Sequence, residues 1–174
     1  MISMARFTLT ELNTLERSRF IACLSDIYEH SPWVAECASL QRPYHTVAEL
    51  ATAMQICVIG ADAAAQLRLI RAHPELAGKL AMQGELTLAS LSEQTGAGLH
   101  NCTAMELSSL TALNLAYRQK FDFPFIIAVR GLTRTDIIQA LKIRLTCTVQ
   151  KEIQTALDEI GHIARFRLLD RIAD

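Results

Sequence analysis

The sequence predicts an all-α protein: one compact, bundle-like domain of residues 1–174 with about seven to eight helices and no sheet. Helix breakers are few, with 7 glycines and 4 prolines in 174 residues. Apolar residues recur with a period near 3.6, the spacing of one helix face. The length suits a single domain, because domains commonly have about 100–150 residues.

The starts of most helices carry a capping-box pattern, in which Ser or Thr is followed three positions later by Glu or Asp. The pattern occurs at Thr8–Glu11, Thr46–Glu49, Ser90–Glu93, Thr103–Glu106 and Thr133–Asp136. Each instance precedes apolar residues at helical spacing, so the pattern predicts where helices begin.

In chain order, helices are expected at residues 8–29, 46–72, 75–83, 90–100, 103–121, 133–146 and 148–171. The first carries an apolar stripe that includes Leu12 and Phe20, and the last carries one that includes Leu157 and Ile160. Gly60 is the point at which the second helix could break. Pro74 immediately precedes the third, and proline is an ordinary way to begin a helix.

Loops are expected at residues 30–33, 39–45, 84–88 and 121–131. Within the last loop, residues 123–129 are aromatic and β-branched. A lone extended segment would have no strand to pair with. A buried, non-helical connector is therefore expected there.

Composition excludes several classes of protein. A hydrophobic share of 51% favours a filled core and an oligomer interface over disorder. A net charge of -1 lacks the basic surplus of a nucleic-acid-binding domain. No membrane span is expected, because no apolar run approaches roughly 18 residues, and the start "MISMARFTLTEL" has no signal-peptide pattern.

The 5 cysteines are odd in number, widely spaced and without a C-x-x-C pair. They are interpreted as reduced, mostly buried thiols of a cytoplasmic protein. No metal site is expected, since His73 and Glu75 are too close in sequence to share a helix face. The sequence also has no P-loop, G-x-G-x-x-G or G-x-S-x-G motif.

His73 lies between two predicted helices, immediately before Pro74. A residue before proline is pushed out of the α region, so His73 should lie at a kink. The end of the preceding helix favours a charged imidazole there, which suits an acid. Judged alone, a helix cap is the favoured interpretation over catalysis.

Residues 90–99, "SLSEQTGAGL", also have two interpretations, a structural one and a ligand-binding one. A capping box explains Ser90 and Glu93 structurally. The two glycines, however, each cost about 1 kcal/mol in a helix interior, which close packing or a ligand would have to offset. Free N–H groups at the helix start would suit an anionic ligand.

Residues 120–131, "KFDFPFIIAVRG", are apolar and irregular. If they are buried, their backbone polar groups need partners, and a polar ligand could supply them. From composition alone, a packed connector remains the favoured interpretation.

Taken together, "YEHSPWVAE", "AHPELA", "SLSEQTGAGL", "LNLAYRQKFDFPFIIAVRG" and "ALDEIGHIARFRL" resemble the 2-oxo-4-hydroxy-4-carboxy-5-ureidoimidazoline (OHCU) decarboxylase family. The resemblance extends from about residue 8 to residue 170. Asp122 departs from the usual glycine of that family, and Cys147 from a frequent asparagine. The transthyretin-like hydrolase domain of some relatives is not seen, so the preceding hydrolysis is not expected of this chain.

The resemblance implies an all-α homodimer in the cytoplasm that needs no metal or organic cofactor. It implies stereospecific decarboxylation of OHCU to (S)-allantoin and CO2, a step of urate and purine catabolism. The catalytic pair would be His73 and Glu93. The substrate-binding residues would be Pro74, Ser90, Leu91, Ser92, Gln94, Phe125, Ile126, Ile127, Ala128, Val129 and Arg167.

Three alternatives stay open from the sequence. Arg167 could form a surface salt bridge on the last helix and not bind a substrate carboxylate. The whole chain could be a non-catalytic helical module that dimerises through its apolar surface. It could also be a related lyase that acts on another ureido compound.

Overall fold

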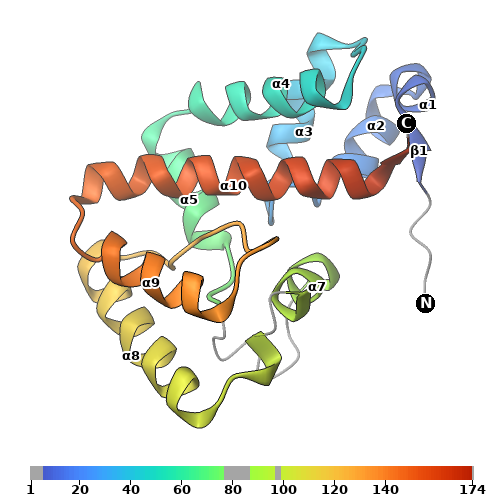
Figure 1. Cartoon of the computed structure of the whole chain (residues 1–174). Coiled ribbons are helices and arrows are strands. Elements are labelled where there is room, and N and C mark those ends of the chain that lie inside the picture. The colour runs from blue at the N-terminus through green and yellow to red at the C-terminus, as the bar shows by residue number, and fades with distance from the viewer. Residues whose placement is uncertain (1–5, 77–86, 97–98, 174) are drawn as a thin grey trace. The chain divides into compact units, whose positions relative to one another are not determined.

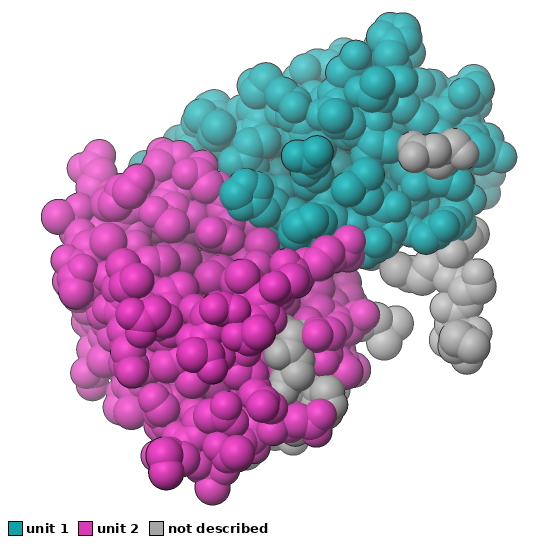
Figure 2. Space-filling view, in the orientation of Figure 1, with its two compact units in different colours: residues 1–69, 160–174 teal, residues 70–159 magenta. Residues whose placement is uncertain are grey.

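The computed structural model describes residues 6–76, 87–96 and 99–173. The chain forms two compact units, residues 1–69 with 160–174 and residues 70–159 (Figure 2). Helices dominate both units, which confirms the all-α class (Figure 1). A single domain spanning residues 1–174 stays a prediction.

The first unit contains the N-terminal helices and the end of the longest helix. Its elements are β1 (Phe7–Thr8), α1 (Leu9–Thr14), α2 (Arg17–Leu24), α3 (Trp33–Ala38), the 3-10 helix η1 (Ser39–Gln41), α4 (Val47–Ile59), most of α5 (Ala63–Ala72), the end of α10 (Val149–Arg171) and β2 (Ile172–Ala173). Its core is mainly aliphatic and also contains the buried rings of Phe20, Tyr28 and Tyr44. Members include Leu12, Phe20, Leu24, Val34, Leu50, Met54, Val58 and Leu168.

The second unit begins with the last turn of α5 and ends with the first part of α10. Between them are α7 (Leu88–Gly96), the 3-10 helix η2 (Leu99–Asn101), α8 (Ala104–Phe121) and α9 (Arg134–Arg144). Helices α8 and α9 pack against each other. The predicted helix at 75–83 lies mainly outside the described residues.

Three predicted capping boxes are confirmed, at the starts of α1, α8 and α9. In each, a threonine side chain accepts a hydrogen bond from a backbone N–H of the first turn, and an acidic side chain accepts one from the cap backbone. At α4, Thr46 accepts from the Glu49 N–H as expected, while the Glu49 carboxylate binds the N–H of His45. Local sequence therefore determines where these helices start.

The predicted box at Ser90 is wrong. Helix α7 begins at Leu88, so Ser90 lies inside its first turn. Thr87 takes the capping position, since its hydroxyl accepts a 3.3 Å hydrogen bond from the Ser90 N–H. Capping therefore does not explain Glu93.

The first predicted helix, residues 8–29, is broken. The backbone is extended at Leu15, where α1 ends, and turns follow α2 after Leu24. The break near Gly60 is confirmed, because Gly60 caps the end of α4. Helix α3 begins at Trp33, the last residue of an expected loop, and continues over residues 34–38, to which no element was assigned. Six residues are too few to show helical periodicity.

The prediction that the chain has no sheet is wrong in one detail, because β1 and β2 form a short parallel ladder. Phe7 pairs with Ile172, and Thr8 pairs with Ala173. The pairing joins two ends of the first unit that are far apart in sequence. Strands of two residues carry no alternating pattern, so the sequence could not reveal them.

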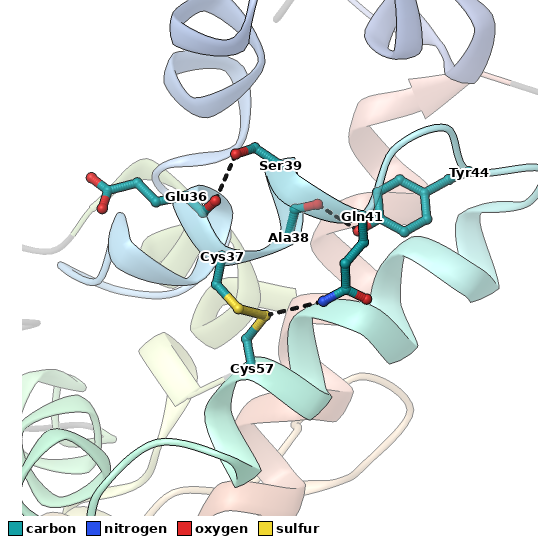
Figure 3. The surroundings of a disulfide bond; sticks show 7 residues. All are labelled: Glu36, Cys37, Ala38, Ser39, Gln41, Tyr44 and Cys57. Carbon is teal, nitrogen blue, oxygen red and sulfur yellow. Dashed lines mark hydrogen bonds between the residues drawn. A yellow bond between two sulfur atoms is a disulfide. The ribbon is translucent and has the colours of Figure 1, made fainter.

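The prediction of uniformly reduced cysteines is wrong for one pair. A disulfide joins Cys37 on α3 to Cys57 on α4, with a Cα–Cα distance of 6.1 Å (Figure 3). Cys23, Cys102 and Cys147 are free thiols. The pair is 20 residues apart in sequence, and the packing of α3 on α4 brings it together.

Within the described residues, no single helix is long and apolar enough to cross a membrane. Helices α4 and α5 pass the length and composition test only as a pair, and this pair is bent by 117°.

Asp122 adopts the left-handed conformation at the end of α8, with φ 62° and ψ 27°. Glycine is the usual residue for this conformation, and aspartate is one of the few others that adopt it readily. Arg71 compensates, because its guanidinium pairs with the Asp122 carboxylate and its Nε donates to the Asp122 carbonyl at 3.2 Å. The departure from the family's glycine therefore has a local structural solution.

Candidate active site

His73 directly follows the last residue of α5. Its backbone N–H donates to the Ile70 carbonyl at 3.2 Å, which closes the helix end. Only 8% of the residue is exposed, and Pro74 follows in non-helical backbone. The predicted kink is confirmed. The imidazole is buried, and whether His73 acts only as a helix cap or also as a catalytic acid stays a prediction.

Helix α8 holds the turn that follows His73. Asn114 is 4% exposed, and its Nδ2 donates to the Leu76 carbonyl at 2.8 Å. One turn further along, Arg118 lies 3.5 Å from the Glu75 carboxylate. Sequence reasoning missed Asn114. The available signal was a polar residue within the apolar spacing that Leu110 and Tyr117 define on α8.

Helix α7 carries the second group of candidate residues. Ser90 is buried, and its hydroxyl lies 3.1 Å from the Thr87 hydroxyl. Glu93 is half-buried, while Leu91 and Ser92 are exposed. The Gln94 side chain lies outside the described residues.

Gly96 is the last residue of α7, and a Cβ added there would meet no atom of the described residues within 4 Å. The expectation that close packing offsets the cost of glycine is therefore wrong at this position. A glycine at the end of a helix also escapes most of the interior penalty.

Residues 123–129, called the connector from here on, are non-helical and mostly buried, as predicted. Three of its backbone groups bind protein atoms. The Ile126 carbonyl accepts from Arg144 Nη1 at 2.6 Å, the Ala128 N–H donates to Glu159 at 2.8 Å, and the Val129 carbonyl accepts from Leu132 at 3.0 Å. Protein contacts therefore satisfy part of the connector backbone, and a carbonyl that already accepts one hydrogen bond has a second lone pair.

An aromatic cluster anchors the start of the connector. Tyr117 lies edge-on to Phe123 and Phe125, at centroid distances of 6.0 and 5.3 Å. Phe121 stacks with Phe123 at 5.9 Å. Offset and edge-on pairs stabilise beyond the area that they bury. The end of α8 and the connector thus share one rigid core in the second unit.

Arg167 belongs to the first unit and is 6% exposed. Its Nη1 donates to the Glu29 carboxylate at 2.8 Å and to the carbonyls of Ile27 and Asp26 at 3.3 and 3.4 Å. The alternative of a surface salt bridge is wrong, because both members of the pair are buried. Glu29, which sequence reasoning did not single out, balances the charge of Arg167. Contact between Arg167 and a substrate stays a prediction.

The described residues contain no group of three His, Cys, Asp or Glu able to hold a metal ion. The sequence interpretation that no Glu-x-x-His pair occurs is wrong, because Glu159 and His162 on α10 have this spacing. One such pair provides fewer ligands than a metal site in a helical bundle ordinarily has.

Residues 13–169 of the sequence match the sequence model of the protein family described as OHCU decarboxylase. The 2-oxo-4-hydroxy-4-carboxy-5-ureidoimidazoline decarboxylase of Haloferax volcanii is 39% identical over 98% of this chain and 99% of its own. The uric acid degradation bifunctional protein PucL of Bacillus subtilis is 40% identical over 97% of this chain, which spans 33% of that protein.

A crystal structure of (S)-allantoin synthase superposes with a TM-score of 0.78 at 31% identity. The match covers 96% of this chain and 54% of that one. The likeness in sequence extends over nearly the whole chain, and the likeness in fold accompanies it. The chain belongs to the OHCU decarboxylase family.

Proposed function

We propose that this protein decarboxylates OHCU to (S)-allantoin and CO2, as a step of urate and purine catabolism. Family membership supports the proposal. The observation that carries it is the burial of His73 at the end of α5, in the same compact unit as Ser90, Glu93 and the connector.

The chemistry requires little beyond orientation, charge stabilisation and one proton. The substrate carries a carboxylate and a hydroxyl on a ring carbon beside an imine. When the bond to the carboxylate breaks, its electron pair enters the adjacent C=N system, so no organic electron sink is needed. The nitrogen that gains this charge takes up a proton. A second proton adds to the former imine carbon, and the hydroxyl loses its proton to become the carbonyl of the product. Delivery of the added proton to one face sets the (S) configuration.

We assign that proton delivery to His73 and the orientation of the substrate hydroxyl to Glu93. Histidine suits proton transfer at neutral pH. A glutamate hydrogen-bonded to the hydroxyl fixes the rotation of the substrate and accepts its proton as the carbonyl forms. Helix α7 begins at Leu88, so this role of Glu93 does not compete with capping.

The remaining candidates bind the substrate in this proposal. Polar atoms of the ureido group and ring would meet Ser90, Gln94 and the connector, with Pro74, Leu91 and Ser92 adjoining them. Arg167 would neutralise a carboxylate, because guanidinium binds that group in a bidentate pair. Its bond to Glu29 would then hold the guanidinium in a fixed orientation.

We further infer a homodimer, with no nucleic-acid or membrane partner. Both units expose large apolar side chains, which an interface could cover. They include Leu40, Ile56 and Ile59 in the first unit and Met105, Leu115 and Ile143 in the second. A net charge of -1 gives no attraction to nucleic acid.

We also propose a cytoplasmic location. The Cys37–Cys57 disulfide is evidence against this location. Disulfides are rare in cytosolic proteins. Free thiols can be alkylated at the moment of cell lysis and then counted by mass spectrometry. This measurement distinguishes a cytoplasmic location from a secreted one. A cytoplasmic protein should be modified at both cysteines, whereas a secreted one should be protected at both.

The test of function adds the purified protein to freshly generated OHCU and follows circular dichroism. The expected result is faster decay with accumulation of one enantiomer of allantoin. Spontaneous decay gives a racemate, so an unchanged rate and a racemic product would contradict the proposal. Such a result would instead favour the non-catalytic dimerisation module.

A further inference from the structure

A buried arginine holds the backbone of the connector. Arg144 lies at the end of α9 and is buried. Its Nη1 donates to the Ile126 carbonyl at 2.6 Å, and its guanidinium carbon lies 4.6 Å from the centroid of the Phe125 ring. One guanidinium therefore contacts two consecutive connector residues, the first through its ring and the second through its backbone.

The position of Arg144 is in turn determined by Glu152, which is 0% exposed in the first turn of α10. Glu152 Oε2 accepts from Arg144 Nε at 2.9 Å and from the Tyr117 hydroxyl at 2.5 Å. Burial and the hydrogen bond to Glu152 raise the pKa of Tyr117, so its hydroxyl remains a donor. Bonds to Nε and Nη1 together leave the guanidinium plane little freedom.

A second acidic side chain of α10 holds the other part of the connector. Glu159, about two helical turns after Glu152, accepts the Ala128 N–H at 2.8 Å. The Ile126 carbonyl and the Ala128 N–H are thus both fixed, and Ile127 lies between them. The connector forms neither a helix nor a strand, so its backbone lacks the hydrogen bonds of those elements. Side chains of α9 and α10 bind the backbone instead.

The buried ion pair of Arg144 and Glu152 needs an explanation. Moving each ion out of water costs several kcal/mol before the pair forms. An apolar replacement of similar volume is often as stable. An apolar side chain, however, cannot donate to the Ile126 carbonyl. Lysine could donate, but it lacks the planar group that lies against Phe125 and binds Glu152 at the same time. The arrangement is specific to arginine.

We propose that Arg144 is a positioning residue, and that with Glu152 and Glu159 it fixes the connector backbone in the conformation that binds substrate. The inference rests on the proposed function for its consequence in catalysis. The holding of the backbone itself can be tested without substrate. Neither Arg144 nor Glu152 touches the substrate in this scheme.

The experiment compares Arg144→Lys with Ile137→Ala, a matched control that removes a buried apolar side chain from the same helix. Both variants should lose thermal stability. Only Arg144→Lys should speed amide hydrogen exchange in a peptide covering residues 123–131. With OHCU as substrate, Arg144→Lys should raise KM by about tenfold, the effect of losing one charge-assisted hydrogen bond. The change in kcat should be smaller, and the excess of (S)-allantoin over the other enantiomer should fall.

Glu159 supplies a second test that does not depend on the folding of Arg144→Lys. Glu159→Ala should free the Ala128 amide and speed its exchange, and Glu159→Gln should restore protection, since glutamine retains an acceptor. If the wild-type protein leaves OHCU unchanged, the proposed function fails while exchange still tests the positioning. If exchange and KM in Arg144→Lys match those of Ile137→Ala, or if Glu159→Ala leaves exchange unchanged, the positioning role is overturned.

Discussion

Asn114 on α8 donates a 2.8 Å hydrogen bond from Nδ2 to the carbonyl of Leu76, in the turn that begins with His73 and Pro74. Both partners are buried. The bond ties the chain beyond the proposed acid to a long helix. The location of His73 therefore depends on a residue distant in sequence.

Replacing Asn114 with leucine should reduce both stability and turnover. The leucine side chain is of similar size but leaves the Leu76 carbonyl without its donor, which costs about 1–3 kcal/mol in a buried site. Urea unfolding measures the first effect, and decay of OHCU the second. Leu115→Ala, at an exposed position on the same helix, is the control and should leave both nearly unchanged.

His73→Ala should lose about 10²–10⁴-fold in kcat, the usual contribution of a general acid, with a much smaller change in KM. His73→Asn separates the two interpretations, because asparagine can end a helix but cannot supply the proton. Steady-state kinetics on both variants provide the measurement. Near-normal turnover by either would remove the imidazole from the mechanism.

Glu93→Gln should retain the fold and lose activity by several hundred-fold, on the order of a lost general acid–base group. Thr87 has the capping position of α7, so the substitution removes no cap. Thermal unfolding should show an unchanged Tm beside the fall in kcat. A variant that turns over normally would restrict Glu93 to a structural role.

Reduction of the Cys37–Cys57 disulfide should lower Tm. Opening a loop of 20 residues removes about 3 kcal/mol in the chain-entropy account. Calorimetry with and without dithiothreitol makes the measurement on the wild-type protein. The double variant Cys37→Ala, Cys57→Ala is the control and should not respond to the reductant. Equal melting of wild-type protein in both conditions would indicate that the bond does not form.

The capping box of α8 predicts a pH dependence. Hydrogen bonds from the Thr103 backbone and hydroxyl hold the pKa of Glu106 below its ordinary value of 4.5. A lowered folded-state pKa contributes stability above the unfolded-state pKa, and that stability is lost as pH falls through the folded value. Glu106→Gln keeps the box geometry and removes the charge.

The Tm of Glu106→Gln should therefore lie below that of the wild-type protein at pH 7. The difference should shrink once pH falls below 4.5. Melting curves of the two proteins across that range test the sign. A difference that grows on acidification would contradict it.

Sequence reasoning succeeded where structure depends on neighbours along the chain. The boxes at Thr8, Thr103 and Thr133 were predicted correctly because cap and partner lie within one helical turn. Ser90 was misplaced for a similar local reason. Thr87 offers a second cap in the same turn, and the pattern alone does not say which threonine or serine the helix selects.

The residues that support the candidate site were beyond such reasoning. A histidine before proline attracts notice by itself, but Asn114 and Arg144 look like ordinary helix residues in the sequence. A polar side chain on a helix gains a role only when packing places a carbonyl or carboxylate against it. The disulfide was missed for the same reason, since α3 and α4 must pack before their cysteines meet.

The ladder between β1 and β2 affects how this chain can be joined to other proteins. Because the strands are parallel, chain preceding Phe7 enters beside Ile172, and chain following Ala173 leaves beside Thr8. A fusion partner joined directly at Phe7 or at Ala173 would thus be tethered to the same place on the first unit. A short linker between the ends would allow circular permutation, with the chain reopened in an exposed loop.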